Sequence, residues 1–364
     1  MAFKKKTRDE LQGIVSGAIA DAKAFIESEI APDRIKAQRY YDGECDLSYE
    51  AGRNKIIVTR VRERGLGEVL PPVEHDLSTA SKVHDPAYLA YLPTAWERWL
   101  AEGNSGPALP SSWPAKGLRR DLVPTSATGL LGHYSIDASA SFVEGTWAAV
   151  KAAHDCALTA AGLVAAGERA AFALCRPPGH HAGTDFMGGY CFINNAAVAA
   201  QSFLDGGAKR VAILDVDYHH GNGTQQIFYE RSDVMVVNLH ADPREEYPYF
   251  LGAAEETGAG AGLGFNHNYP MPLGTAWAGW SASLEDGCRK ITAYDPDVVV
   301  ISLGVDTFEK DPISGFKLKT EDYPKIGRRI AALGKPTLFV MEGGYAVEEI
   351  AINTVGVLEG FEEA

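Results

Sequence analysis

The sequence predicts an α/β fold of three layers, in which a mostly parallel sheet carries helices on both faces. From about residue 145 onward, short and continuously apolar runs alternate with longer segments of helical period. This alternation is typical of strands that are buried on both faces and joined by helices. Each apolar run also ends in polar, glycine-rich sequence, and ligands of open α/β sheets bind at such strand ends.

Five apolar runs are expected to be the strands of this sheet. They cover residues 170–175, 211–217, 234–240, 298–303 and 337–341. The segments between and after them have the apolar spacing of one helix face. The expected helices cover residues 146–166, 194–204, 277–292, 321–333 and 347–358. Since the carboxyl ends of parallel strands share one edge of a sheet, the five following loops should converge on one site.

The composition of the 364-residue chain indicates a globular protein with one large domain and an appendage, or with two domains. Its 34 basic and 48 acidic residues give a formal charge of -14, which argues against a nucleic-acid partner. The charged start of the chain is unlike a secretory signal or a membrane span, so we expect no membrane partner. Five cysteines without a C-x-x-C pair fit a reducing, cytoplasmic location.

The chain differs in character before and after residue 62. Residues 1–62 are expected to form a mostly helical N-terminal extension, and residues 63–364 are expected to form the main domain. Within that domain, residues 102–121 are rich in proline, glycine and serine, which predicts a long excursion.

Carboxylates and an imidazole alternate in the stretch ILDVDYHHGNGT, at residues 213–224, where an apolar strand is expected to end. Asp215, Asp217 and His219 occupy alternate positions, and alternate residues of a strand share one face. Because the preceding residues are apolar, these polar groups should be buried, and buried charges need compensation. A divalent metal would provide it, and a third ligand with a water would complete a zinc-type catalytic site.

Two adjacent histidines, His180 and His181, follow the strand that is expected to end at Cys175. They lie in the segment RPPGHHAGTDFMGGYCFINNAA, at residues 176–197. A single histidine is most often a structural residue. A tandem pair in a loop rich in glycine and proline, at the carboxyl end of a sheet, favours a role in the site instead.

These two segments, together with SLGVDTFEKDP at residues 302–312 and MEGGY at residues 341–345, resemble the zinc-dependent deacetylases of the histone deacetylase superfamily. The nearest branch is that of the bacterial acetylpolyamine amidohydrolases. The similarity runs from about Gly65 to the C-terminus. It implies an arginase/deacetylase-like fold and hydrolysis of a small acetylated amine to acetate and a free amine. An acetyl-lysine protein or peptide is the alternative substrate.

The resemblance assigns the metal to Asp217, His219 and Asp306, which matches the ligand set expected from the residue pattern. Zn(II) is the expected ion, and Fe(II) or Co(II) would also suit oxygen and nitrogen ligands. In the family, the residue corresponding to Tyr345 donates a hydrogen bond to the substrate carbonyl. Gly343 and Gly344 before it give the backbone the freedom that this placement needs.

The histidine pair resembles the proton-handling pair of the family. By that resemblance His181 is the general base and acid, and His180 is its electrostatic partner. Asp215 is expected to bond His180, and Asn222 is expected to bond His181. Since Asn222 is neutral, His181 should have a lower proton affinity than a histidine backed by a carboxylate.

Substrate access in this family is through a narrow tunnel with aromatic walls. Gly189, Tyr190 and Tyr247 occupy the matching positions of this sequence. Family members also bind a structural monovalent cation, K+ or Na+, chiefly through backbone carbonyls. The positions that match this second site are Asp215, Asp217, His219, Asn238 and Leu239.

The sequence departs from the acetylpolyamine pattern at the tunnel mouth. Thr128 and Ser139 stand where the related enzymes have acidic residues, and only Asp137 is near them. The loss of these carboxylates should weaken discrimination in favour of long polycations. The excursion at residues 102–121 resembles the insertion that builds a dimer in this branch, so we expect a homodimer with slender substrates.

Residues 1–62 resemble the N-terminal segment of podovirus-type phage portal proteins. A virion assembly or interaction protein is therefore the alternative of another class. No opening strand of the deacetylase type is legible before Gly65, and residues 55–61 (KIIVTRV) are the candidate to fill its place. An arginase-like binuclear manganese hydrolase is a further alternative, which would need additional aspartate ligands.

Overall fold

The centre of the molecule is a parallel sheet of six strands in the order β1-β6-β5-β2-β3-β4. The computed structural model describes residues 47–114, 119 and 121–364, and residues 48–364 form one compact unit. The strands are β1 (Ala170–Ala173), β2 (Val211–Asp215), β3 (Val234–Ala241), β4 (Asn266–Met271), β5 (Val298–Leu303) and β6 (Thr337–Met341). All five expected strands are confirmed, and β4 is additional.

The five expected helices are confirmed with ends shifted by a few residues. They are α7 (Thr146–Ala165), α8 (Asn195–Asp205), α10 (Trp277–Tyr294), α11 (Tyr323–Ala331) and α12 (Ile350–Glu362). Further helices are α3 (Leu47–Arg64), α4 (Pro86–Tyr91), α5 (Ala95–Ala101), α6 (Ala127–His133) and α9 (Asn222–Phe228). Short 3-10 turns lie at Ala80–Lys82, Leu92–Thr94, Gly260–Gly262 and Thr320–Asp322. Within the described residues, none of the helices is long and apolar enough to cross a bilayer.

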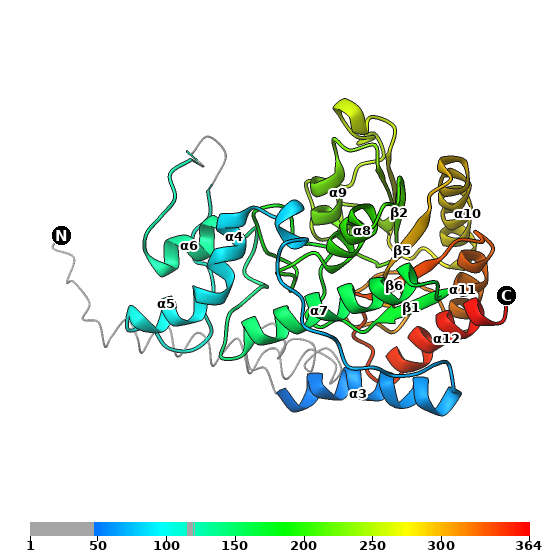
Figure 1. Ribbon diagram of the computed structural model, residues 1–364, viewed down its shortest axis with the longest axis horizontal. Coiled ribbons are helices and arrows are strands. Elements are labelled where there is room, and N and C mark those ends of the chain that lie inside the picture. Colours follow the sequence, from blue (N-terminus) through cyan, green and yellow to red (C-terminus); the bar gives the residue numbers. More distant parts are fainter. Residues whose placement is uncertain (1–46, 115–118, 120) are drawn as a thin grey trace, which may run out of the picture. The chain divides into compact units, whose positions relative to one another are not determined.

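Helices cover both faces of the sheet (Figure 1), and strand residues alternate between two cores, one on each face. Ile213, Val236 and Val300 belong to the core that includes residues of α7 and α8, while Leu214 and Ile301 belong to the core beneath α10, α11 and α12. All five are almost completely buried. The period of two therefore places apolar side chains on both faces, which explains the continuous apolar runs and confirms the three-layer α/β fold.

Two of the helices, α8 and α4, begin at side-chain caps. The Asn194 side chain accepts a hydrogen bond from Ala197 N (2.9 Å) at the start of α8. The Asp85 carboxylate accepts one from Ala87 N (2.7 Å) at the start of α4, where Pro86 occupies the first turn. Both arrangements satisfy backbone N–H groups that have no partner inside the helix.

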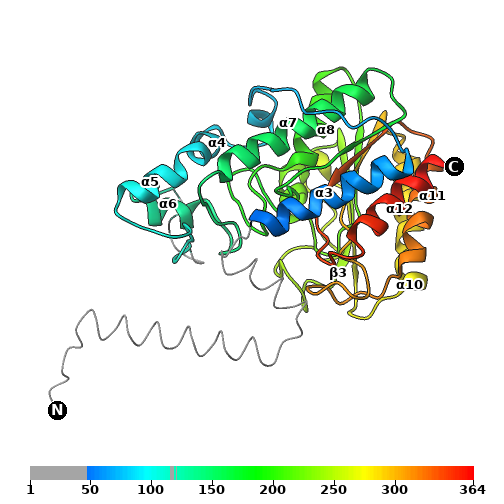
Figure 2. The same ribbon diagram turned by 90° about the horizontal axis from the view of Figure 1, so that it is seen from below.

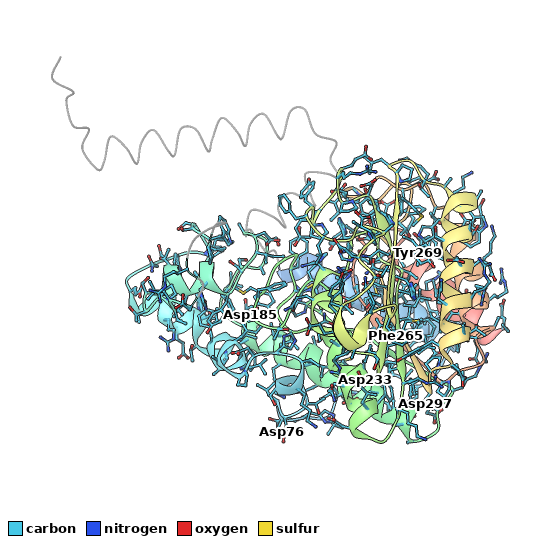
Figure 3. All side chains as sticks on the ribbon, turned by 90° about the horizontal axis from the view of Figure 1, so that it is seen from above. Asp76, Asp185, Asp233, Phe265, Tyr269 and Asp297 are labelled. Atoms are coloured by element: carbon cyan, nitrogen blue, oxygen red, sulfur yellow. The ribbon has the colours of Figure 1, made fainter. Side chains whose placement is uncertain are left out.

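Strand β4 was not predicted, because its sequence NHNYPM is polar and contains a proline. It forms the edge of the sheet beside β3, and an edge strand tolerates proline and polar residues. Figure 3 shows Tyr269 of this strand beside α10, where its hydroxyl donates to an Asp286 carboxylate oxygen at 2.6 Å. Tertiary contacts thus hold a strand that its own pattern does not predict.

Residues 55–61, the candidate for the missing opening strand, are part of helix α3. Ile57 on this helix is fully buried, and Arg64 forms an ion pair with Glu359 on α12. Figures 1 and 2 both draw α3 alongside α12. In the part of the chain that is described, no strand pairs with the outer side of β1. The expected domain boundary after residue 62 stays a prediction, and helix α3 runs across this boundary. Residues 1–46 lie outside the described residues.

The two ends of the sheet carry acidic residues in different environments. At the amino ends, Asp297 is exposed and accepts hydrogen bonds from Lys209 N (2.7 Å) and Arg210 N (3.1 Å). Figure 3 shows Asp233 and Asp297 close to one another at that end. At the carboxyl ends, by contrast, Asp215 and Asp217 are completely buried. Buried acids at the end where ligands bind identify this edge as the candidate site.

Candidate metal and catalytic site

Three expected metal ligands come together at the carboxyl end of the sheet. Asp217 and His219 lie in the loop after β2, and Asp306 lies in the loop after β5. Their ligand atoms are all within 4.8 Å of one another. His219 Nδ1 is 3.3 Å from Asp217 Oδ1 and 3.0 Å from Asp306 Oδ2. β2 and β5 are neighbours in the sheet, so the two loops necessarily lie side by side.

The charges of these three groups fit a divalent cation. Burial and the Asp217 carboxylate raise the pKa of Asp306 to about 6, against the opposing pull of His219. Burial disfavours a charged His219, but its bonds to Asp217 and Asp306 raise the pKa of that imidazole well above its usual value. Two buried carboxylates and an imidazole in contact form a donor set that a doubly charged ion would neutralise.

Backbone groups orient the carboxylates of this cluster. Gly343 N donates to Asp217 Oδ2 (2.8 Å), and Tyr218 N donates to Asp306 Oδ1 (2.8 Å). A Cβ atom at Gly343 would lie 2.5 Å from Asp306 Oδ2, so only glycine fits there without displacing a ligand. The glycine of the MEGGY segment therefore serves the predicted metal site directly.

The histidine pair lies beside this cluster, with the two partners that the sequence predicted. His180 Nδ1 is 3.0 Å from Asp215 Oδ2, and His181 Nδ1 is 2.7 Å from Asn222 Oδ1. The two imidazole rings are 4.0 Å apart, and all four side chains are buried. Since Asn222 Oδ1 only accepts hydrogen bonds, His181 Nδ1 carries the proton and Nε2 keeps a free lone pair.

The two imidazoles differ in their affinity for protons. Burial disfavours a charged His180, but Asp215 and Asp217 outweigh it and raise the pKa of His180 to about 10. Burial lowers the pKa of His181 well below its usual value, and the charges of His180 and His219 lower it further. At neutral pH, therefore, His180 is protonated and His181 is neutral. The low proton affinity of His181 thus comes from burial and from the two neighbouring imidazoles, whereas the hydrogen bond to Asn222 acts in the opposite direction and raises the pKa.

Of the expected tunnel residues, Gly189 and Tyr247 lie beside His181, and Tyr190 lies near Tyr345. The Tyr247 ring is 4.9 Å from the His181 ring, and the Tyr190 ring is 6.2 Å from the Tyr345 ring. Gly189 has a φ of +52°, and a Cβ there would lie 2.1 Å from His181 Cδ2. Glycine is required at this position by both its backbone conformation and its close approach to the base.

Asp137, the acid near the tunnel mouth, is already bonded on both carboxylate oxygens. Oδ2 accepts from Tyr247 OH (2.5 Å) and Gly189 N (3.1 Å). Oδ1 accepts from Ser139 N (2.8 Å) and Ser139 Oγ (2.6 Å), while Thr128 lies on α6. The carboxylate thus holds Gly189 and Tyr247, two of the expected tunnel residues, and both of its oxygens are already engaged.

The residues expected at the monovalent cation site lie at the ends of β2 and β3. The register pairs Asp215 with Asn238, and Leu239 follows on the same strand. Both β3 residues are completely buried. Asn238 Oδ1 is bonded to His240 Nδ1 at 2.8 Å, so the side-chain oxygen at this position already has a partner.

Two site residues were not identified from the sequence. Glu342 is fully buried and its Oε2 accepts from Gly179 N (2.7 Å) and His180 N (3.2 Å), which ties the histidine loop to the end of β6. Burial raises the pKa of Glu342 to about 7 against the charge of His180. Its position directly after an apolar strand was the available signal.

Arg53 donates to Glu342 O (2.5 Å) from α3, and its guanidinium is 5.7 Å from the centre of the Tyr345 ring. Arg53 was missed because residues 1–62 were assigned outside the catalytic domain.

Comparisons with known proteins agree with this geometry. The acetylpolyamine amidohydrolase 1 of Pseudomonas aeruginosa is 56% identical over 325 residues, which are 89% of this chain and 94% of the relative. The acetylpolyamine amidohydrolase of Mycoplana ramosa is 53% identical over 321 residues, which are 88% of this chain and 94% of the relative. The crystal structure of an acetylpolyamine aminohydrolase from Burkholderia pseudomallei matches with a TM-score of 0.81 and 38% identity, covering 85% of this chain and 90% of that chain.

The family model described as "Histone deacetylase domain" matches residues 48–361. This match begins earlier than the similarity legible from about Gly65, and it includes helix α3. The resemblance seen in the sequence is confirmed, because both the family model and the relatives cover most of the chain. The chain belongs to the histone deacetylase domain family.

Proposed function

We propose that the protein is a metal-dependent deacetylase that removes acetyl groups from small amines such as acetylpolyamines. The observation that carries this proposal is the buried cluster of Asp217, His219 and Asp306 beside the paired imidazoles. The high identity to relatives named acetylpolyamine amidohydrolases supports the substrate class. The reaction adds water to the acetyl amide and yields acetate and a free amine.

Zn(II) is the proposed ion at these three ligands, and Fe(II) or Co(II) are the alternatives. When bound there, it supplies Lewis-acid polarisation of the amide carbonyl and of the attacking water. The cluster supplies three protein ligands, and a catalytic zinc site has at least four coordination positions, so a position would remain for water or substrate. This arrangement favours the mononuclear design over an arginase-like binuclear site.

The remaining steps belong to the side chains around the cluster. His181 Nε2 takes the proton of the attacking water and later gives it to the leaving amine. His180 stays protonated beside Asp215, and its positive charge stabilises the negative charge that develops on the former carbonyl oxygen. The Tyr345 hydroxyl donates a hydrogen bond to that same oxygen. Gly189, Tyr190 and Tyr247 hold the acetylated chain and limit the access of bulk water.

Replacing Asn222 with aspartate should move the acid limb of the pH profile of kcat/KM upward by about one pH unit. A carboxylate beside His181 would raise the pKa of this base. Because the base acts in its neutral form, activity would then be lost at a higher pH as the solution is acidified. The measurement is kcat/KM against pH for both proteins.

The matched control for this experiment is Gln226→Glu, which adds a carboxylate on the same helix. Gln226 bonds Thr184 N at 2.7 Å, and no contact joins it to His181 among the described residues. Its acid limb should stay in place. An acid limb of Asn222→Asp that is unchanged or moved downward would contradict the assignment of His181 as the base.

A panel of acetylated amines, assayed on protein of known metal content, tests the substrate class. We expect kcat/KM for acetylputrescine to exceed that for an acetyl-lysine peptide by about tenfold or more, because the aromatic walls favour a slender chain over a branched backbone. A longer acetylated polycation should gain little over acetylputrescine, since the Asp137 oxygens are already bonded. Preference for the peptide would support the alternative, an acetyl-lysine deacetylase, and turnover of no acetylated amine would refute the proposal.

Three further expectations belong to the proposal. A structural K+ or Na+ is proposed near Asp215, Asp217, His219, Asn238 and Leu239, supported by the register that brings the ends of β2 and β3 together. A homodimer is proposed through residues 102–121, of which residues 115–118 and 120 lie outside the described residues. A cytoplasmic location is proposed, supported by cysteines that are free in the described part of the chain. The portal-like interpretation of residues 1–62 stays a prediction.

A further inference from the structure

The turn that carries Tyr345 is held at its backbone by one buried side chain from another loop. Asp311 Oδ2 accepts hydrogen bonds from Tyr345 N (2.7 Å) and Ala346 N (3.2 Å). The other oxygen, Oδ1, accepts from Ile313 N at 3.1 Å. One carboxyl group thus binds two successive N–H groups of the Gly-Gly-Tyr turn and anchors itself to its own loop.

The burial of Asp311 shows that this contact is built into the interior. The residue is 6% exposed, and among the described residues it has no cationic partner. A buried carboxyl group without an ion pair is costly unless hydrogen bonds compensate it, and the three N–H donors provide this compensation. Burial and Asp306 raise the pKa of Asp311 to about 8, against the pull of these bonds. Both protonation states accept hydrogen bonds, so the contact does not depend on titration.

The two residues before Tyr345 are glycines, so they have no side chains of their own that could fix the backbone at Tyr345 by packing. Gly344 has a φ of +133°, and a Cβ there would lie 2.6 Å from Val305 Cγ2. The Asp311 carboxyl group accepts the hydrogen bond of Tyr345 N and so holds the backbone directly at this residue. An error of about 1 Å in the position of a reacting group is enough to lower a rate about a hundredfold.

We propose that Asp311 is a positioning residue for Tyr345, which holds the phenol at the substrate carbonyl by binding the backbone of its turn. This inference rests on the proposed function, in which the phenol donates to the carbonyl oxygen. The hydrogen bonds of Asp311 go to its own loop and to the turn, so in this proposal it acts on the phenol through the backbone of the turn. It extends the site to a residue that supplies geometry rather than chemistry.

The first test replaces Asp311 with asparagine, which has nearly the same shape. One of its two terminal groups is a donor, so it must face either Ile313 N–H or the pair of N–H groups on the turn, and at least one bond is lost. We expect kcat to fall by about tenfold to a hundredfold while KM changes by less than about threefold. Metal content per chain should equal that of the unmodified protein.

The decisive test repeats the substitution in a Tyr345→Phe protein. If Asp311 acts through the phenol, the double variant should have a kcat within about threefold of Tyr345→Phe alone, because the group that it positions is already gone. A general loss of structure would instead lower kcat by the same factor in both backgrounds. Equal factors, or an Asp311→Asn protein with unchanged kcat, would overturn the inference and leave the proposed function standing.

A second variant and a control keep the test decisive. Asp311→Glu retains the acid but moves its oxygens by about 1.5 Å. It should lower kcat in the unmodified protein and leave kcat nearly unchanged in the Tyr345→Phe background, and it serves as the test if Asp311→Asn fails to fold. Asp322→Asn changes another buried carboxylate, which accepts hydrogen bonds from Lys319 N at 2.9 Å and from Lys325 Nζ at 2.7 Å rather than from the turn. Its kcat should stay within about twofold. A Tyr345→Phe protein with unchanged kcat would refute the proposed role of the phenol, and the role of Asp311 with it.

Discussion

Replacing Asp306 with alanine is expected to remove the divalent cation and to lower kcat/KM by about a thousandfold or more. Asp306 is the only one of the three clustered ligands that comes from the loop after β5. Without it, two ligands from a single loop remain, which is too few for a stable site. Metal per chain, measured by mass spectrometry, and acetylputrescine turnover are the two readouts. Chelation of the unmodified protein should give the same loss, and added Zn(II) should reverse it.

In the metal-free protein, the same substitution is expected to leave the thermal stability unchanged or to raise it. The pKa of Asp306 is raised to about 6 by burial and by Asp217, so the ionised carboxylate is disfavoured in the folded state. This penalty develops as the pH rises from the unfolded pKa near 4 through the folded value, and it is fully present above it. At pH 8 the metal-free Asp306→Ala protein should therefore have a Tm equal to or above that of the metal-free parent.

Asp297→Ala is the control for both measurements. Asp297 belongs to the amino end of β5, opposite the cluster, and it bonds Lys209 N at 2.7 Å (Figure 3). This variant should keep one metal per chain and nearly full turnover. Full metal content in Asp306→Ala would overturn the ligand assignment, and two metals per unmodified chain would favour the binuclear, arginase-like alternative.

Replacing His181 with alanine is expected to lower kcat by about a thousandfold while the metal content stays unchanged. His181 is the neutral imidazole of the pair. Its Nδ1 donates to Asn222 Oδ1 at 2.7 Å, so its Nε2 carries no proton and can accept one. Removing it leaves the three ligands intact but removes the group that accepts and returns the proton. The measurement is single-substrate kinetics on protein of known metal content.

The control for this prediction is His267→Ala, which removes a partly buried imidazole from the edge strand β4. That variant should retain kcat within about twofold. If the His181→Ala protein kept more than a tenth of the activity, the proton transfer would have to be assigned to another group. His180 would then be the next candidate, although its pKa of about 10 leaves it protonated at neutral pH.

The features predicted correctly from the sequence are those that depend on local pattern. The continuous apolar runs at β2 and β5 predict strands buried on both faces, and the parallel order then requires the loops with Asp217 and Asp306 to meet. The pairing of His181 with Asn222 was expected from the family resemblance, and in the structure His181 Nδ1 lies 2.7 Å from Asn222 Oδ1. The hydrophobic pattern did not predict β4, because its sequence is polar. This strand is stabilised by its place at the edge of the sheet and by the hydrogen bond from Tyr269 OH to Asp286.

The sequence by itself determined five of the six strands, the family, and the side chains expected at the metal cluster, because periodicity and motif spacing act over short stretches of chain. Only the tertiary structure decided that residues 55–61 are helical, that Arg53 reaches Glu342 O, and that Asp311 binds the backbone of Tyr345. These contacts join segments that are far apart along the chain. Buried polar groups must be hydrogen-bonded, and which groups come within bonding distance depends on how the layers pack. A local sequence pattern therefore cannot predict these contacts.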